Sequence, residues 1–171
     1  MIILILIFPV LSISFDCESE GSGAPEDTKS SNGSSEMIFD IKIPDGFKSV
    51  AVDEPGIFKW VKGSAEIYVV VGDIFSKSGP VVFEALKKAA QKDKTVEEVK
   101  NLKIKGAKAA LIKEKAPTDT NRLRSWRMIV VTGNQIVNVD FSSPAKEFKT
   151  YMKNFDEAVR SFKINSNSKK G

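Results

Sequence analysis

The residue types that commonly carry catalysis are scarce in this chain of 171 residues, which contains no histidine and a single cysteine, Cys17. Without an imidazole, the chain forms neither a serine–histidine catalytic pair nor a histidine-ligated zinc, copper or iron centre. One cysteine gives no intrachain disulfide and no metal site made of several thiolates. The serines Ser76, Ser78 and Ser125 lack the sequence contexts of activated nucleophiles. The sequence therefore predicts no catalytic residue, no metal and no cofactor.

The carboxylates also lack the spacing of a catalytic or calcium site. Glu97 and Glu98 are adjacent, so their side chains diverge on a strand and splay apart on a helix. Five other acidic residues could meet at one end of a sheet as Ca²⁺ ligands, but they fit no calcium-loop spacing and are better explained as turn residues: Asp40, Asp45, Asp53, Glu54 and Asp73. Acid–base catalysis and calcium binding are therefore not predicted.

Cationic residues gather in one stretch of the sequence and suggest a binding surface. Its members are Lys103, Lys105, Lys108, Lys113 and Lys115, followed by Arg122, Arg124 and Arg127 beside Trp126. If the strands that carry them pair, the charges gather on one edge or face, where Trp126 offers a flat surface for apolar or cation–π contacts. The alternative is that the lysines solvate an exposed strand edge while Trp126 belongs to the core. The partner-binding hypothesis names Lys113, Lys115, Arg122, Arg124, Trp126 and Arg127.

The net charge of +4 combines two parts of opposite sign. Residues 16–36 carry six acidic residues and one lysine, whereas residues 37–171 carry 25 lysines and arginines against 16 acidic residues. The second part is basic and would attract nucleic acid, anionic lipid or an acidic protein by the same Coulomb force. Nucleic acid is disfavoured, because the chain begins with an apparent export signal and shows no known nucleic-acid motif.

The amino-terminal residues are typical of an export signal and a tether. Residues 1–13 form an apolar run that is shorter than the roughly 20 residues of a membrane-spanning helix and fits a signal peptide. Cys17 and the acidic, serine- and glycine-rich residues after it resemble the start of a bacterial lipoprotein, in which the cysteine is acylated. Two features depart from that pattern: the preceding Ser14-Phe15-Asp16, and the absence of a basic residue before the apolar run.

Three interpretations of this amino-terminal part stay open. Acylation of Cys17 and a plain cleaved secretory signal are equal alternatives, and a cytosolic chain with a wrongly assigned start is the third. We predict an extracytoplasmic protein, in the periplasm or outer cell envelope, that is lipid-anchored or, as the second choice, secreted. The predicted parts are a signal peptide over 1–16, a disordered acidic tether over 17–36, a folded domain over 37–165 and a disordered tail over 166–171.

Alternation of apolar and polar residues predicts a series of strands in the folded domain. The expected segments are a strand over 37–44, an extended piece over 47–52, a hairpin of 57–61 with 65–75, two strands around Gly106 over 99–117, and a hairpin of 123–133 with 134–143. Most consecutive strands are joined by turns too short for a parallel crossover. The sheet is therefore predicted to be mainly antiparallel.

Two segments have the periodicity of amphipathic helices. The first begins at Ser78-Gly79-Pro80, and its apolar side carries Val82, Phe83, Leu86, Ala89 and Ala90. The second begins near Ser143-Pro144, ends before a short strand over 161–164, and has one stripe with Phe148, Tyr151, Met152, Phe155, Val159 and Phe162. Together the elements predict an α+β fold, a mainly antiparallel sheet flanked by helices as an α/β/α sandwich.

The order of these elements resembles the PsbP-like superfamily, which includes PsbP, the small Ran-binding Mog proteins and bacterial lipoproteins of the DcrB kind. The resemblance rests on the strand ending Ile43-Pro44-Asp45-Gly46-Phe47, the Gly106-Ala107 turn, the long hairpin, and the closing helix that ends Ser161-Phe162-Lys163-Ile164. It covers nearly all of residues 37–164. It implies a non-catalytic binding or assembly domain and, for bacterial members, an extracytoplasmic location. Metal sites of plant members involve histidines, which this chain lacks.

Two functions follow as hypotheses. In the first, the chain is a non-enzymatic extracytoplasmic binding or assembly module, a membrane-tethered lipoprotein that uses the basic strands to engage an acidic protein partner or an anionic surface. In the second, it is a carrier of a small apolar ligand, held in a groove between the closing helix and the sheet where Trp60 and Tyr151 line a pocket.

Overall fold

A computed structural model describes residues 38–75 and 78–165 of the chain. The predicted signal peptide over 1–16, the tether over 17–36 with Cys17, and the tail over 166–171 lie outside the described residues. They therefore stay predictions.

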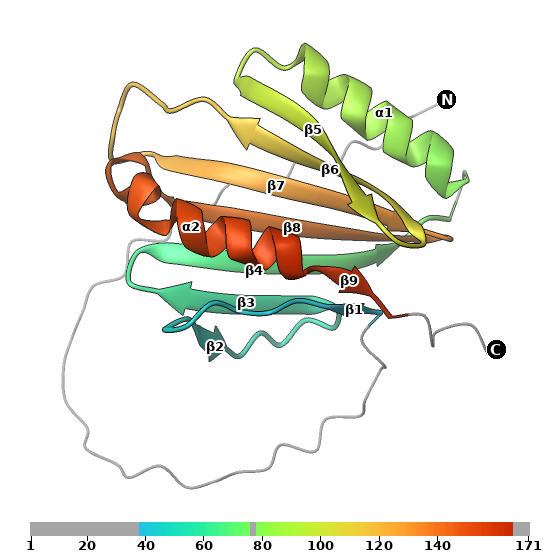
Figure 1. The fold of residues 1–171 in the computed structure, drawn as a ribbon, viewed down its shortest axis with the longest axis horizontal. Helices are drawn as coiled ribbons and strands as arrows, with labels where there is room; N and C mark the ends of the chain where they lie inside the picture. The colour runs from blue at the N-terminus through green and yellow to red at the C-terminus, as the bar shows by residue number, and fades with distance from the viewer. Residues whose placement is uncertain (1–37, 76–77, 166–171) are drawn as a thin grey trace, which may run out of the picture. The chain divides into compact units, whose positions relative to one another are not determined.

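A seven-stranded sheet forms the centre of the domain, and every pair of neighbouring strands in it is antiparallel (Figure 1). In spatial order the strands are β2 (Lys48–Val50), β3 (Ile57–Lys62), β4 (Ala65–Asp73), β8 (Gln135–Pro144), β7 (Leu123–Thr132), β6 (Ala107–Glu114) and β5 (Val96–Ile104). β2 and β5 are therefore the two edges of the sheet.

One helix packs on each face of this sheet. α2 (Ala145–Ser161) lies against β8 and β7 on the face turned toward the viewer in Figure 1, here called the front face. α1 (Gly79–Lys92) lies against β5, β6 and β7 on the back face. A small two-stranded sheet of β1 (Phe39–Asp40) and β9 (Lys163–Ile164) adds its apolar residues to the front core. The α+β fold with helices on both faces is therefore confirmed.

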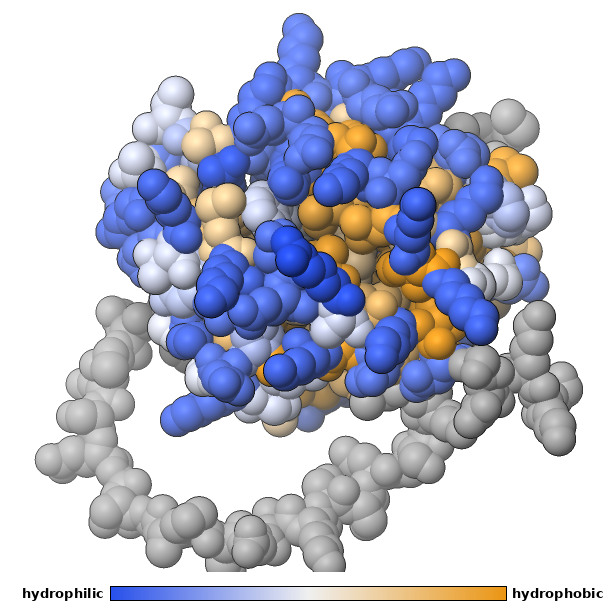
Figure 2. Space-filling model, viewed as in Figure 1, coloured by the Kyte–Doolittle hydropathy of each residue, from blue (hydrophilic) through white to orange (hydrophobic). Residues whose placement is uncertain are grey.

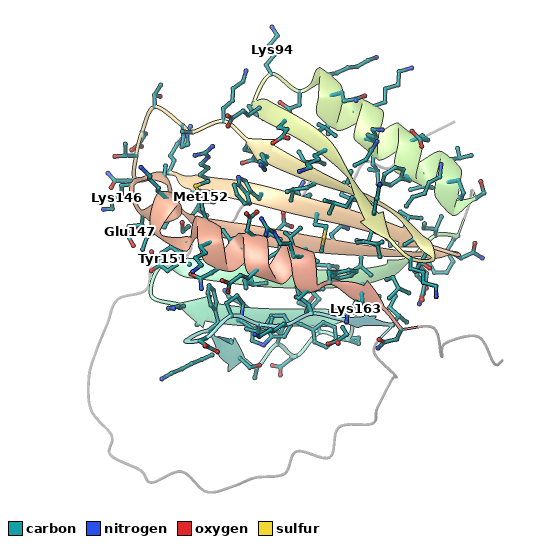
Figure 3. All side chains as sticks on the ribbon, in the orientation of Figure 1. Lys94, Lys146, Glu147, Tyr151, Met152 and Lys163 are labelled. Carbon is teal, nitrogen blue, oxygen red and sulfur yellow. The ribbon has the colours of Figure 1, made fainter. Side chains whose placement is uncertain are left out.

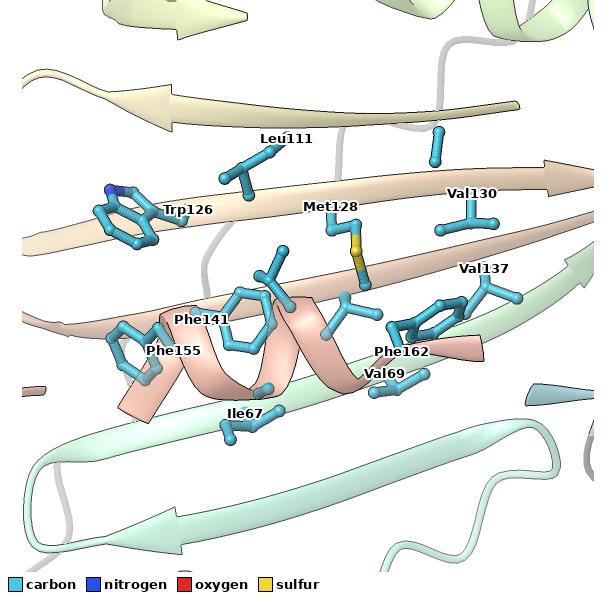
Figure 4. Close-up of a cluster of buried hydrophobic side chains, with 14 of the residues drawn as sticks. Ile67, Val69, Leu111, Trp126, Met128, Val130, Val137, Phe141, Phe155 and Phe162 are labelled. Carbon is cyan, nitrogen blue, oxygen red and sulfur yellow. The ribbon is translucent and has the colours of Figure 1, made fainter. Parts of the chain in front are cut away.

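Two hydrophobic cores fill the spaces between the sheet and its helices, because adjacent residues of a strand point to opposite faces. Leu111 and Met128 belong to the front core, whereas their chain neighbours Ile112 and Ile129 belong to the back core. In the front core, Phe155 of α2 packs against Phe141 of β8, with ring centroids 5.4 Å apart (Figure 4). A fully buried Phe side chain contributes roughly 1.5–3 kcal/mol relative to an exposed one, so these rings hold α2 to the sheet.

The predicted helices and hairpins are confirmed, whereas the strand predicted over residues 37–44 is wrong beyond its beginning. β1 spans only Phe39–Asp40, since its partner β9 has two residues, and the backbone N–H of Lys42 donates instead to Ser161 Oγ at 2.9 Å. Pro44 also lacks a backbone donor for a strand ladder. β5 begins at Val96, three residues before the predicted strand, and its register shifts between Val96 and Glu98.

Neither α1 nor α2, the helices of the described part, is long and apolar enough to cross a membrane.

Gly79 allows α1 to start close to the turn between β7 and β8. A Cβ atom at this position would overlap the carbonyl oxygen of Gly133 and lie 2.8 Å from Cγ1 of Val131. We predict that Gly79→Ala lowers the free energy of unfolding by about 1–3 kcal/mol, the usual cost of overpacking, as measured by urea denaturation. In the control Gly72→Ala, the new Cβ would lie 3.6 Å from Ile136 Cγ2, an ordinary contact. Equal losses in the two variants would contradict this account.

Candidate binding surface

The structure divides the predicted cationic cluster between the two faces of the sheet. Lys113, Arg124 and Trp126 lie on the front face, as their contacts with one another and with Phe148 of α2 show. Arg127, the chain neighbour of Trp126, lies on the back face, where its Nε donates to Asp140 Oδ1 at 2.7 Å. Lys115 and Arg122 are exposed residues just outside the ends of β6 and β7. The six residues therefore do not form one surface.

Trp126 is a core residue, with 3% of its surface exposed. Its ring meets Phe148 edge-on, with centroids 5.5 Å apart, and Lys113 Nζ lies 4.8 Å from the ring centroid. Arg124 Cζ lies 5.0 Å from the centroid of Phe148, so the two cations cover the aromatic pair. The indole N–H has no hydrogen-bond acceptor among the described residues. The expectation that Trp126 offers a contact surface is therefore wrong, and the alternative core interpretation is confirmed.

Both cations beside Trp126 and Phe148 are also paired with a carboxylate. Lys113 Nζ lies 2.9 Å from Glu98 Oε2, and Arg124 Nη2 lies 2.9 Å from Glu97 Oε2. The hydrogen bond and the charge of Lys113 hold the pKa of Glu98 below its ordinary value. Such partly exposed ion pairs contribute about 0–1 kcal/mol each to the free energy of unfolding. They also leave little uncompensated positive charge around Trp126.

The part of the front face that α2 leaves uncovered is apolar. α2 packs on β8 and β7, so the front sides of β5 and β6 carry no helix. Leu102, Ile104 and Ala107 are half-buried there, and Met152 of α2 packs against the same core. Figure 3 shows Met152 on the side of α2 nearest β7, with Tyr151 on the other side. We call Leu102, Ile104, Ala107 and Met152 the front strip; Figure 2 shows apolar surface on this face between hydrophilic side chains.

Exposed lysines flank the front strip on both sides. Lys100 and Lys105 belong to β5 and its turn, and Lys149 and Lys153 project from α2. Within the described part of the chain, none of these four takes part in an ion pair. An apolar centre with a cationic rim fits an apolar partner segment that carries acidic residues at its margins.

The uncovered part of the back face differs from the front strip. It includes two ion pairs that lie across neighbouring strands, between Lys59 and Glu66 at 3.0 Å and between Arg127 and Asp140 at 2.7 Å. The opposite charges therefore compensate one another on this face. The uncovered back face thus carries paired charges, whereas the front strip is apolar, so the front strip is the better candidate for binding a partner.

Aromatic side chains pack around Trp60, one of the two residues predicted to line a ligand pocket. Phe39 of β1 stacks on Phe162 at 5.6 Å and meets Phe58 edge-on at 5.7 Å, while Trp60 stacks on Phe58. An open cavity of about 280 Å³ lies elsewhere, lined by Pro80, Gly106, Ala107, Lys108, Val131 and Gly133. The groove expected beside Trp60 and Tyr151 stays a prediction.

The acidic residues do not assemble into a metal site in the described ranges, where no three Asp, Glu or Cys side chains form a group able to hold an ion. Asp93 instead caps a turn: its Oδ1 accepts hydrogen bonds from the hydroxyl and backbone N–H of Thr95, which lower the pKa of Asp93. The carboxylate of Asp93 therefore has a local role in this turn.

Comparison with solved structures identifies the fold. A PsbP from the cyanobacterium Synechocystis superposes with a TM-score of 0.50 at 14% identity, covering 75% of this chain and 87% of the other. LpqN of Mycobacterium tuberculosis, a protein involved in cell envelope biogenesis, gives 0.58 at 9% identity and covers 74% and 83%. The fold is PsbP-like.

A third solved structure matches over less of its own length. A protein of Bacteroides thetaiotaomicron superposes with a TM-score of 0.52 at 16% identity, over 78% of this chain and 47% of that one. No family model and no curated protein sequence matches the chain. The resemblance inferred from the order of the elements is thus confirmed at the level of the fold.

The front strip is not recognisable as a site from the sequence alone. The alternation of Leu102 and Ile104 with lysines predicts a strand with one apolar side, and that part is confirmed. The strand pattern does not predict whether a helix covers the apolar side of β5. Only the position of α2 over β7 and β8 shows that no helix does.

The burial of Trp126 gives a test of its role. We predict that Trp126→Ala lowers the free energy of unfolding by about 3–5 kcal/mol, because the indole fills the space beneath Lys113 and Phe148. Trp126→Phe should cost less, since it keeps a ring and removes a buried N–H that lacks an acceptor. Urea denaturation of both variants measures the difference. Changes below ~0.5 kcal/mol in both would instead assign Trp126 to an exposed surface.

Proposed function

We propose that this chain is a non-enzymatic, extracytoplasmic binding module, tethered to a membrane through acylated Cys17, that engages a protein partner through the front strip. The observation that carries the proposal is the uncovered apolar surface of β5 and β6 with its cationic rim. Apolar side chains that gather on one face, rimmed by charge, are typical of binding sites in soluble domains.

The chemistry of the partner follows from the composition of this surface. Leu102, Ile104 and Met152 supply apolar contacts, while the surrounding lysines supply long-range attraction for acidic groups. The matching segment is an amphipathic one, with apolar residues at its centre and Asp or Glu at its margins. Lys115 and Arg122 are exposed at the other end of β6 and β7 and lie outside this margin.

Two observations support the remaining parts of the proposal. The lack of histidine and of a nucleophile context favours binding over catalysis. The likeness to LpqN, described as involved in cell envelope biogenesis, favours a place in the cell envelope, as do the apolar run and Cys17.

Site-specific photocrosslinking tests the proposal in intact cells. A photoreactive phenylalanine analogue replaces Leu102 or Ile104 in the full chain, and Tyr68 serves as the control because it lies on the back face, opposite Asp140. We predict that both front positions capture the same protein, identified by mass spectrometry, and that the control captures at least tenfold less. Adding Lys100→Glu and Lys149→Glu should weaken the capture, since both charges at the rim are reversed.

Two results would contradict the proposal. Equal capture from the front and back positions would mean that the front strip has no special role. Capture of no protein, together with a small molecule that copurifies with the wild-type chain in native mass spectrometry and is lost in Leu102→Lys, would favour the carrier of a small apolar ligand.

A further inference from the structure

Apolar side chains that neither core covers lie on the back face of β3 and β4. Phe58 and Ile67 pack in the front core, so the residues that alternate with them point to the back. Four of the six back positions from residue 57 to 61 and from 66 to 70 are apolar or aromatic, namely Ile57, Val61, Tyr68 and Val70. Among the described residues, the two cores include none of these four side chains. A sheet face that meets only water is typically polar at such positions, so this composition suggests a partner.

One row across the back face has charges of opposite sign on either side of an aromatic ring. The strand registers align four residues on β3, β4, β8 and β7, in this order: Lys59, Tyr68, Asp140 and Arg127. Neighbouring strands lie about 4.8 Å apart, so Lys59 and Asp140 flank Tyr68 symmetrically. A two-fold axis along β4 therefore brings Lys59 opposite Asp140 of a second copy, and Asp140 opposite the second Lys59. We call Lys59, Glu66, Arg127 and Asp140, with the four apolar residues above, the back patch.

The charges of the back patch balance within one copy and would alternate in sign between two. Lys59 pairs with Glu66 at 3.0 Å, and Arg127 pairs with Asp140 at 2.7 Å. Across the axis, Lys59 then lies between its own Glu66 and Asp140 of the second copy. The two Glu66 side chains meet near the axis, where each keeps its own Lys59. Among the described residues of β2, β3, β4 and β8, Lys48 is the one further charge on this side.

Charge favours the back patch over the front face as the surface where two copies meet. Residues 37–171 carry 25 lysines and arginines against 16 acidic residues, so two copies repel each other at most approaches. At the front strip, the unpaired lysines of one copy would face those of the other. At the back patch, Lys59 and Asp140 each face the opposite charge. The front strip therefore suits an acidic partner, whereas the back patch suits a second copy of the chain.

The shape of the domain leaves room for this contact. α1 covers the back of β5, β6 and β7, and β2 is the opposite edge of the sheet. An axis along β4 places the second α1 beyond β2, so the two helices flank the facing strands. A patch about 19 Å wide and about 25 Å long, from β2 to β8, gives roughly 500 Å² per copy. The total of about 1,000 Å² is near the lower limit of specific interfaces, so we expect a weak dimer.

We infer that a second copy of this chain docks on the back patch, with the two sheets face to face and a two-fold axis along β4. Tyr68 then packs against Tyr68 of the second copy, and Lys59 pairs with Asp140 of the second copy in both directions. Sheets stacked in this way lie about 10 Å apart with their strands nearly aligned, which this axis allows. The two front strips lie on the outer faces of the dimer and stay open to a protein partner. A dimer of this kind depends on neither the tether nor that partner.

Charge reversal on one side of each contact tests the axis. Every chain is full-length and carries Cys17→Ala, which removes the only thiol, and sedimentation equilibrium measures the Kd of the dimer. Lys59→Glu sets a carboxylate opposite Asp140, and Asp140→Lys sets an ammonium opposite Lys59, so each variant alone should raise the Kd about tenfold or more. An equal mixture of the two variants should restore the Kd to within about threefold of the parent, because both contacts of the mixed dimer join opposite charges.

The mixture also excludes misfolding as the cause of a lost dimer, since an unfolded variant restores nothing. Lys149→Glu is the matched control, because it changes the net charge by as much as Lys59→Glu but lies on α2, on the front face. It should leave the Kd of the dimer within about twofold of the parent.

Three results would overturn the inference. A parent chain that stays monomeric up to about 0.5 mM would mean that the back patch binds no second copy. A dimer that neither reversal weakens would mean that two copies meet on another surface. A mixture that fails to restore the dimer would mean that Lys59 does not face Asp140.

The photocrosslinks separate this dimer from the proposed function. A photoreactive residue at Tyr68 should capture a second copy, recognised by twice the mass of the chain, whereas Leu102 should capture a different protein. A monomeric chain that is still captured by a partner at Leu102 leaves the proposed function intact and refutes only the dimer. A dimer with no capture at Leu102 refutes only the proposed function.

Discussion

Two helices cannot cover both faces of a seven-stranded sheet, and this limit on coverage shapes the rest of the molecule. α1 covers the back of β5, β6 and β7, whereas α2 covers the front of β7 and β8, so the helices are staggered across the sheet. Each face keeps an uncovered part. On the back the ion pairs of Lys59 and Arg127 occupy it, and on the front an apolar strip remains beside a lysine rim.

The same limit explains why the cations around Trp126 stabilise the fold instead of forming a contact surface. At the start of β7 the front core extends past the cover that α2 provides, and Lys113 and Arg124 lay their side chains over Trp126 and Phe148. Long cationic side chains can bury their stems on apolar groups while their charged ends stay partly in water. Glu97 and Glu98 then pair with those ends. The lysines that flank the front strip on β5 and α2 remain without a carboxylate partner among the described residues.

The local sequence pattern was sufficient to predict the strands, both helices and the antiparallel sheet, because the period of apolar residues and the turn residues are local properties. It failed for residues 41–44, where the partner strand β9 is too short to extend the ladder, and this depends on the distant end of the chain. Arg124 and Arg127 are three positions apart on β7, so strand alternation places their side chains on opposite faces of the sheet. The sequence alone could have predicted this separation. The uncovered front of β5 could not be predicted, because it depends on where the helices dock.

The functional account depends above all on the tether, since a protein partner in the envelope requires that the domain is exported and held there. Detergent phase partitioning with intact mass measurement of the full-length chain, expressed in a bacterium beside Cys17→Ala, tests this most directly. The account predicts a detergent-phase chain that begins at Cys17 and carries acyl mass, and a variant that loses both properties. A water-soluble chain that begins near Phe15, or one that retains Met1 in the cytosol, would contradict it.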